Sequence, residues 1–431
     1  MALTGRAGLL ALLGVVFVGV AMPSWTGILL VLLVVLVCVG IDLALAGRVR
    51  SLTFTRSGAT QVRLGETVSV SLTVRNPGRR RVRGVLRDAW PPSAGVVSDR
   101  FSVDVPAGAS RTVSVELQPV RRGDRIASRV TVRSLGPLGV AARQGSHAVP
   151  WTVRALPPFH SRKHLPPLLE RLRELDGRRA SLVRGQGTEF DSLREYVIGD
   201  DVRSIDWRAT ARTTDVMVRT WRPERDRQVV IVLDTARTAA GRVAGELGGL
   251  PRLDTAMDAA LLLSALAIHA GDRVDLIAYS RQVRASVSRA SLPELVSAMA
   301  PLDAELVEFD ARGMVAEVLR RARQRSLVVL LTGLDPAALE EGLVPMLPAL
   351  ASRHRLLVAS VTDPAVTTMA RGRGDAAEVY GAAAAERTLA ERRHAKALLT
   401  RLGVDVVDAV PAELPPSLAD RYLALKAQGK L

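Results

Sequence analysis

RQVVIVLDTART, at residues 227–238, is the stretch that decides the fold of the C-terminal half of the chain. It begins with a short, continuous apolar run, which is typical of a β-strand covered on both faces. Helical patterns alternate with four similar runs further along, at Val274–Tyr279, Leu327–Thr332, Leu356–Val361 and Val404–Val407. This alternation predicts an α/β domain over residues 227–431 with a mainly parallel, doubly wound sheet.

A charged segment, residues 185–226, precedes this domain and contains REYVIGDDVRSIDWRATAR at residues 194–212. That stretch holds four acids and four arginines, so it is neutral within a chain of formal charge +16. Balanced charge with aromatic residues threaded through it indicates a polar network or an interface. The residues expected to form it are Arg194, Glu195, Tyr196, Gly199, Asp200, Asp201, Arg203, Asp206, Trp207 and Arg212.

The local chemistry of this stretch predicts a tight turn followed by a packed segment. Gly199 can adopt the positive φ of such a turn. Val202, Ile205 and Trp207 are then expected to pack inward, while Arg203 and Arg208 meet carboxylates in bidentate pairs. The network could clamp the segment onto the first strand of the α/β domain, or it could form a surface on which a partner docks.

A catalytic role is the third hypothesis for these acids. Asp200, Asp201, Asp206 and Asp234 could together hold a metal for hydrolysis of phosphoesters or peptides. The stretch contains no His, Lys or Cys that could serve as a general base, which weakens the enzyme hypothesis.

The first 50 residues contain two apolar runs, residues 3–22 and 27–45. About 20 helical residues at about 1.5 Å each match a hydrocarbon core of about 30 Å. We therefore expect a transmembrane hairpin rather than a cleaved signal peptide. Arg6 precedes the first run, and Arg48 and Arg50 follow the second, so the positive-inside rule places both ends and the soluble domains in the cytoplasm. Asp42 is interpreted as a residue of the membrane boundary.

Alternating polar and apolar residues, broken by turn signals, cover residues 51–156 and predict an antiparallel β-sandwich. Residues 157–184 are expected to be a linker that includes an amphipathic helix, because leucines recur there at helical spacing.

The excess of positive charge has three possible partners: nucleic acid, anionic lipid or an acidic protein face. The arginines are spread along the chain and no nucleic-acid motif accompanies them, which favours an anionic lipid surface over nucleic acid. Cys38 is the single cysteine, so no disulfide framework is expected.

The end of the first α/β strand resembles the start of a von Willebrand factor A domain. The metal-binding loop of that family reads Asp-x-Ser-x-Ser, and this chain has Asp234, Ala236 and Thr238 in those places. The second carboxylate that the resemblance implies is displaced to Asp335. The resemblance thus implies a degenerate site for a divalent metal such as Mg²⁺ at Asp234, Thr238 and Asp335. Without an ion, Asp234 and Thr238 would cap the next helix.

A second resemblance covers the charged segment. It is similar to the signature of the bacterial domain-of-unknown-function 58 family through Gly187-Thr188-Glu189-Phe190, Leu193-Arg194-Glu195-Tyr196, Gly199-Asp200-Asp201, Arg203, Ile205-Asp206-Trp207 and Ala211-Arg212. The turn Leu135–Gly139 also resembles an Asp-Pro-Leu-Gly element of that family, with Gly136 where the aspartate would be. The resemblance implies two N-terminal membrane helices, a β-rich segment, an A-like C-terminal region and a partner among MoxR-type AAA+ ATPases or other membrane proteins.

These observations predict a non-enzymatic, multi-pass protein of the cell membrane with two spans. We expect it to act as an adaptor or partner of a MoxR-type AAA+ ATPase. The alternative is a metal-dependent hydrolase that uses the four aspartates named above.

Overall fold

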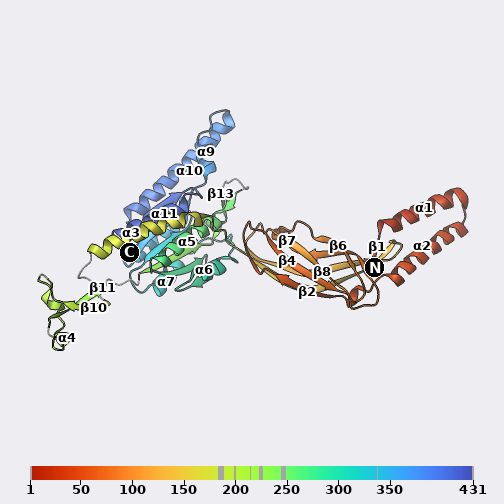
Figure 1. Cartoon of the computed structure of the whole chain (residues 1–431). Helices are drawn as coiled ribbons and strands as arrows, with labels where there is room; N and C mark the ends of the chain where they lie inside the picture. The colour runs from red at the N-terminus through yellow and green to blue at the C-terminus, as the bar shows by residue number, and fades with distance from the viewer. Residues whose placement is uncertain are drawn as a thin grey trace. The chain divides into compact units, whose positions relative to one another are not determined.

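The computed structural model describes residues 2–182, 189–198, 200–213, 215–222, 227–243, 249–336 and 338–429. The chain divides into two compact units, Met1–Leu156 and Pro157–Leu431 (Figure 1). Each unit has its own hydrophobic core.

Two apolar helices begin the first unit, α1 (Gly5–Ala21) and α2 (Trp25–Leu45), and they contact each other. The Ser24 side chain caps α2 by accepting a hydrogen bond from the Gly27 amide. Within the described part of the chain, one helical span, Trp25–Ser51, is long and apolar enough to cross a membrane, whereas α1 is a shorter apolar helix.

Two sheets build the rest of this unit. The larger contains β1 (Ala2–Leu3), β9 (Ala141–Leu156), β8 (Gly123–Leu135), β5 (Val82–Ala89) and β6 (Arg100–Val105) in that order, with β3 (Gln61–Arg63) beside β9. The smaller has the order β2 (Thr53–Gly58), β4 (Val68–Arg75), β7 (Ser110–Leu117). Inward residues of β4 such as Leu72 share one core with Leu86 and Val130 of the larger sheet.

The predicted antiparallel β region is therefore present, with one difference. The short strand β3 runs parallel to β9, while the other pairs within both sheets are antiparallel.

A six-stranded sheet forms the centre of the second unit, in the order β16 (Val283–Val287), β15 (Arg273–Tyr279), β12 (Gln228–Asp234), β17 (Leu327–Leu331), β18 (Arg355–Val361), β19 (Asp405–Ala409). Its five apolar strands are parallel and match the predicted runs. The edge strand β16 is antiparallel and was not predicted. Its side chains are mostly exposed, so it lacks the apolar run that reveals the others.

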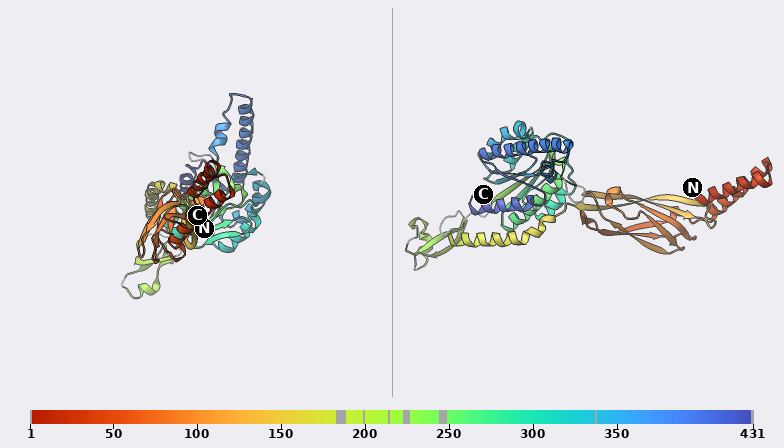
Figure 2. Two further views of the ribbon diagram at one scale, coloured as in Figure 1. Left: turned by 90° about the vertical axis from the view of Figure 1, so that its right-hand side faces the viewer. Right: turned by 90° about the horizontal axis from the view of Figure 1, so that it is seen from above.

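Helices cover both faces of this sheet (Figure 2). Helix α5 (Arg252–His269) contacts α3 (Leu165–Leu182), α6 (Leu292–Met299) and α11 (Leu414–Ala427). A separate core joins Val230 and Val232 of β12 to α7 (Ala311–Arg321) and α10 (Ala376–Arg401). Because alternate strand residues point to opposite faces, β12 is buried on both sides.

Residues 338–351 form three short helical pieces in place of one continuous helix. A π-helical turn (η6, Ala338–Leu343) leads into a 3-10 turn (η7, Val344–Met346) and then into α8 (Leu347–Ala351). Pro345 and Pro348 remove backbone donors here, which explains why a continuous α-helix does not form. The remaining short elements are η1 (Val49–Ser51), η2 (Pro92–Ala94), η3 (His160–His164), η5 (Arg237–Ala240), β13 (Arg242–Val243), β14 (Leu250–Pro251) and α9 (Pro364–Met369).

Candidate functional site

The charged segment folds as a hairpin with its own two-stranded sheet, which we call the signature hairpin (residues 189–222). Strand β10 (Glu189–Glu195) pairs antiparallel with β11 (Met217–Arg222), and the connection holds η4 (Val202–Ser204) and α4 (Trp207–Thr210). The central six-stranded sheet has β15 and β17 on either side of β12. The simplest form of the clamp hypothesis is that the signature hairpin pairs with β12 as a neighbouring strand. The strand order shows no such pairing, because β10 and β11 form a separate sheet.

Two arginine-carboxylate pairs stabilise this hairpin. Arg194 donates to both oxygens of Asp200 at 2.8 and 2.6 Å, and Arg219 donates to Asp206 at 2.7 Å. Hydrogen bonds from the Arg194 side chain and the Val197 amide lower the pKa of Asp200. The arginines that meet carboxylates are thus Arg194 and Arg219, whereas we predicted Arg203 and Arg208.

Two acids of the stretch, Asp201 and Asp206, cap short helices. Asp206 also accepts from the amides of Arg208 and Ala209 at 3.0 Å, and Asp201 accepts from the Arg203 amide at 3.0 Å. Asp200, Asp201 and Asp206 are thus each engaged by a nearby arginine or backbone amide. In the part of the chain that the structure describes, no group of three or more His, Cys, Asp or Glu side chains could hold a metal.

Val202 and Trp207 face outward, which contradicts the prediction that they pack inward, whereas Ile205 is half-buried. Trp207 is 67% exposed and Val202 61%, while Ile198 is 96% exposed. A two-stranded sheet has no second layer to pack against, so it cannot bury both faces. Of the other predicted residues, Glu195 and Arg212 are exposed and Tyr196 is half-buried. Gly199 lies outside the described residues.

A hollow of about 340 Å³ lies beside the exposed tryptophan of the signature hairpin. It is lined by three arginines with Trp207, and its full lining is Arg203, Ser204, Ile205, Asp206, Trp207, Arg208 and Arg219. Apart from the paired Arg219, its cations Arg203 and Arg208 are exposed. The surface thus combines an aromatic ring with positive charge.

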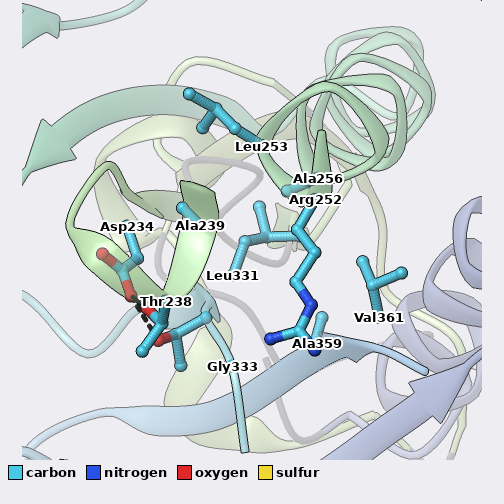
Figure 3. Close-up of a pocket in the computed structure, with 11 residues that line it drawn as sticks. Asp234, Thr238, Ala239, Arg252, Leu253, Ala256, Leu331, Gly333, Ala359 and Val361 are labelled. Carbon is cyan, nitrogen blue, oxygen red and sulfur yellow. Dashed lines mark hydrogen bonds between the residues drawn. The ribbon is translucent and has the colours of Figure 1, made fainter. Parts of the chain in front are cut away.

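Asp234 ends β12 at the carboxyl edge of the central sheet, where it is almost fully buried. One carboxylate oxygen accepts from the Ala236 amide at 2.7 Å. The other accepts from the hydroxyls of Thr238 and Thr332, both at 2.6 Å (Figure 3). Burial raises the pKa of Asp234 although these hydrogen bonds oppose the shift. Thr332 was not predicted at the site. It directly follows β17, the strand that pairs with β12, and this position could have indicated that its hydroxyl lies near Asp234.

The predicted third ligand, Asp335, lies near the site, since its charge adds to the rise in the pKa of Asp234, but its neighbour is a cation. Its carboxylate lies 3.9 Å from Nη1 of Arg252. A divalent ion needs several oxygen ligands, yet Ala236 supplies no side-chain oxygen and a guanidinium lies beside the second carboxylate. The residues present therefore do not fit a divalent ion well. Binding of Mg²⁺ at Asp234, Thr238 and Asp335 stays a prediction, and calorimetry with Mg²⁺, Mn²⁺ and Ca²⁺ tests it.

Asp42 was interpreted from the sequence as a residue of the membrane boundary, and its structural role was not predicted. Asp42 near the end of α2 is fully buried and accepts from the amides of Leu138, Val140 and Ala141 at 2.7, 2.6 and 2.9 Å. A Cβ at Gly136 would lie 2.3 Å from Oδ1 of Asp42. Residue 136 therefore has no room for a side chain, because the Asp42 carboxylate from α2 occupies that space and binds the turn.

This chain therefore has the architecture of a multidomain protein with three parts. They are an apolar N-terminal helix, an antiparallel β region and an α/β domain preceded by a charged hairpin. The profile of a family described as "Protein of unknown function DUF58" matches residues 192–415, which is just over half of the chain. The chain belongs to this family.

Relatives of this chain include uncharacterized proteins of Mycobacterium tuberculosis and Mycobacterium bovis. They are 29% identical over 198 residues, which is 44% of this chain and 60% of the relatives. The match therefore spans less than two thirds of the length of these relatives.

Among solved structures, the CARDB domain of a Pyrococcus furiosus protein in complex with di-metal ions matches with a TM-score of 0.19 and 14% identity, over 24% of this chain and 86% of that domain. A Listeria innocua beta-glucosidase matches with a TM-score of 0.16 and 18% identity, over 23% of this chain and 16% of that enzyme. Scores this low support no inference about function.

Proposed function

We propose that this chain is a membrane-anchored, cytoplasm-facing interaction module that binds a MoxR-type AAA+ ATPase through the signature hairpin. The observation that carries this proposal is the exposure of Trp207 beside Arg203 and Arg208 around the hollow. Tryptophan and arginine are the residue types that most often dominate binding energy in protein interfaces.

The exposed surface also limits the chemistry of the partner. Val202 and Ile198 offer apolar contact, and two exposed arginines surround Trp207. The partner should therefore present an apolar groove rimmed by carboxylates. We favour this over the clamp hypothesis because residues that fix a segment to its own domain would be buried.

Membrane anchoring by two spans, α1 and α2, is part of the proposal. The long apolar side chains of both helices are exposed, as lipid-facing residues are. The buried Asp42 and the Arg143 side chain, which donates to the Leu43 carbonyl at 2.7 Å, join the end of α2 to the β domain. Exposed arginines at residues 48, 50 and 79 support contact with anionic lipid.

The α/β region is proposed to be a von Willebrand A-like domain. The support is its strand order, in which the first strand is central and a single antiparallel strand lies at one edge. No specific observation favours the hydrolase hypothesis.

The test uses the full chain in lipid nanodiscs and a purified MoxR-type ATPase from the same organism. We expect Trp207→Ala to weaken binding at least about tenfold, because truncating an interface anchor costs about 2 kcal/mol or more. Arg203→Ala should weaken binding less. Tyr380→Ala removes an exposed aromatic ring from α10 and is the control that should bind normally. Wild-type binding by both hairpin variants would exclude the signature hairpin as the docking surface.

A further inference from the structure

Arg252, the first residue of α5, has a side chain without a good partner. Its backbone amide donates to the Gly241 carbonyl at 2.8 Å, but its buried Nε has no hydrogen-bond acceptor among the described residues. The ion pair with Asp335 is long, at 3.9 Å, and the Asp335 side chain is half-exposed. The Arg252 side chain itself is only 24% exposed. A guanidinium that is mostly removed from water normally has several hydrogen-bond acceptors.

The surroundings of this guanidinium form a small pocket at the carboxyl ends of β12 and β17, the usual place for ligands in open α/β sheets. Thr332 and Gly333 line one part of it, and Leu253, Ala359 and Val361 make another part apolar. The Arg252 guanidinium points into this pocket, whereas the Asp234 carboxylate is turned toward Thr238 (Figure 3). Asp234 cannot neutralise Arg252 without giving up its own hydrogen bonds to two threonines.

We propose that Arg252 receives a carboxylate side chain, glutamate or aspartate, from a protein partner at this pocket. The two terminal nitrogens of a guanidinium match the two oxygens of a carboxylate in a bidentate pair. The incoming carboxylate replaces Asp335, whose present contact is loose and open to solvent.

The size of the pocket selects this ligand. Its volume is about 20 Å³, little more than one water molecule occupies. One oxygen of a carboxylate fits into this space, while the second oxygen and the rest of the ligand stay at its mouth, so a planar carboxylate fits better here than a bulkier tetrahedral phosphate. This inference is independent of the proposed ATPase docking, because it concerns a different sheet and different residues.

The experiment compares two peptides, acetyl-Gly-Glu-Gly-amide and its Gln counterpart, titrated into the full chain in nanodiscs with EDTA present. Binding is read from the rise in the thermal unfolding midpoint, since a ligand of the folded state stabilises it. We expect the Glu peptide to bind at least about tenfold more tightly, because the hydrogen bonds of its carboxylate to the guanidinium are charge-assisted and those of the Gln amide are not. Arg252→Gln should remove this preference.

Two further variants keep the test decisive if Arg252→Gln folds poorly. Asp335→Asn should strengthen binding of the Glu peptide up to about fivefold, because it removes a weak internal competitor. Arg237→Gln, at an exposed arginine 3.9 Å from Glu308, should leave the preference unchanged. Equal binding of the two peptides to the wild type, or no binding, would overturn the proposal. A preference that persists in Arg252→Gln, or that requires added Mg²⁺, would overturn it as well.

Discussion

Strand β12 and the signature hairpin are close in sequence, yet the apolar side chains of β12 are buried and several of those of the hairpin are exposed. From Val229 to Asp234, β12 is buried throughout, whereas Ile198, Val202 and Trp207 of the hairpin are largely exposed. Strand β12 has a paired strand on each side and helices on both faces, and the hairpin has a single paired strand. Apolar composition predicts burial only where a second layer of structure exists.

Charged residues follow the same contrast. Arg56 and Asp88 in the β domain form a bidentate pair whose side chains are 1% and 0% exposed. Arg194 and Asp200 make the same pair in the hairpin, with side chains 38% and 21% exposed. Identical chemistry should therefore contribute differently to stability in the two places.

The largest expected effect is the loss of the buried pair. Asp88→Ala should cost about 3–5 kcal/mol in the free energy of unfolding, because it leaves the Arg56 guanidinium buried and uncompensated. Asp200→Ala should cost less than about 1 kcal/mol, since water solvates the Arg194 side chain that remains. Urea denaturation of the two variants, followed by tryptophan fluorescence, measures both. The Trp90 indole donates to Asp88 at 2.8 Å and reports directly on the buried site. Equal losses would show that the hairpin pair is buried in the folded protein.

The next effect compares two isoleucines. Ile231→Ala in the middle of β12 should destabilise the α/β region by about 2–5 kcal/mol, because it leaves a cavity in a packed interior. Ile198→Ala in the hairpin should change stability by less than about 0.5 kcal/mol. Equilibrium denaturation followed by circular dichroism measures the difference. A large loss for Ile198→Ala would mean that another part of the protein covers this residue.

The predictability of each part from sequence follows from the same physics. The parallel strands were recognisable because both of their faces are buried. Burial on both faces requires consecutive apolar residues, such as Val229–Leu233. The edge strand β16 carries no such run. In the hairpin, the acids and arginines were recognised, but which arginine meets Asp206 depends on the pairing of β10 with β11, which places Arg219 beside it.

Part of each candidate site depended on contacts distant in sequence. Asp234 and Thr238 were found from their local spacing, whereas Thr332 and Arg252 join the pocket only through the sheet order and the start of α5. Asp42 looked like a boundary residue because nothing near it in sequence explains a buried carboxylate. Its three donors come from a turn almost a hundred residues away.

A medium effect is expected where that turn meets α2. Gly136→Ala should cost about 1–3 kcal/mol, because the added Cβ would lie 2.5 Å from the Cα of Asp42 and backbone must shift. Gly108→Ala is the control for a loop glycine with open space around it, although its positive φ carries a smaller cost of its own. Thermal unfolding of the two variants in nanodiscs compares them. A smaller loss at Gly136 than at Gly108 would contradict the close approach of the turn to α2.

The smallest effect concerns pH and compares two histidines. His354 is buried before β18, and neither ring nitrogen has a hydrogen-bond partner among the described residues. Burial together with the nearby Arg353 cation lowers its pKa below 6.5. The folded protein thus keeps His354 neutral at pH values where the unfolded chain binds a proton. Its contribution to stability is complete above about pH 6.5 and is lost as the pH falls below that value, by at most about 1.4 kcal/mol per pH unit.

His354→Leu should therefore flatten the fall in unfolding free energy between neutral and mildly acidic pH, relative to the wild type. His394 is exposed on α10, and His394→Leu should leave that slope unchanged. Urea denaturation at a series of pH values gives the slopes of all three proteins. Buried carboxylates such as Asp258, whose pKa is raised by burial, act with the opposite sign, so the difference between wild type and variant isolates the histidine. If His354→Leu keeps the wild-type slope, the imidazole takes up its proton as readily in the folded chain as in the unfolded one, and the interior around β18 is more open to water than its packing implies.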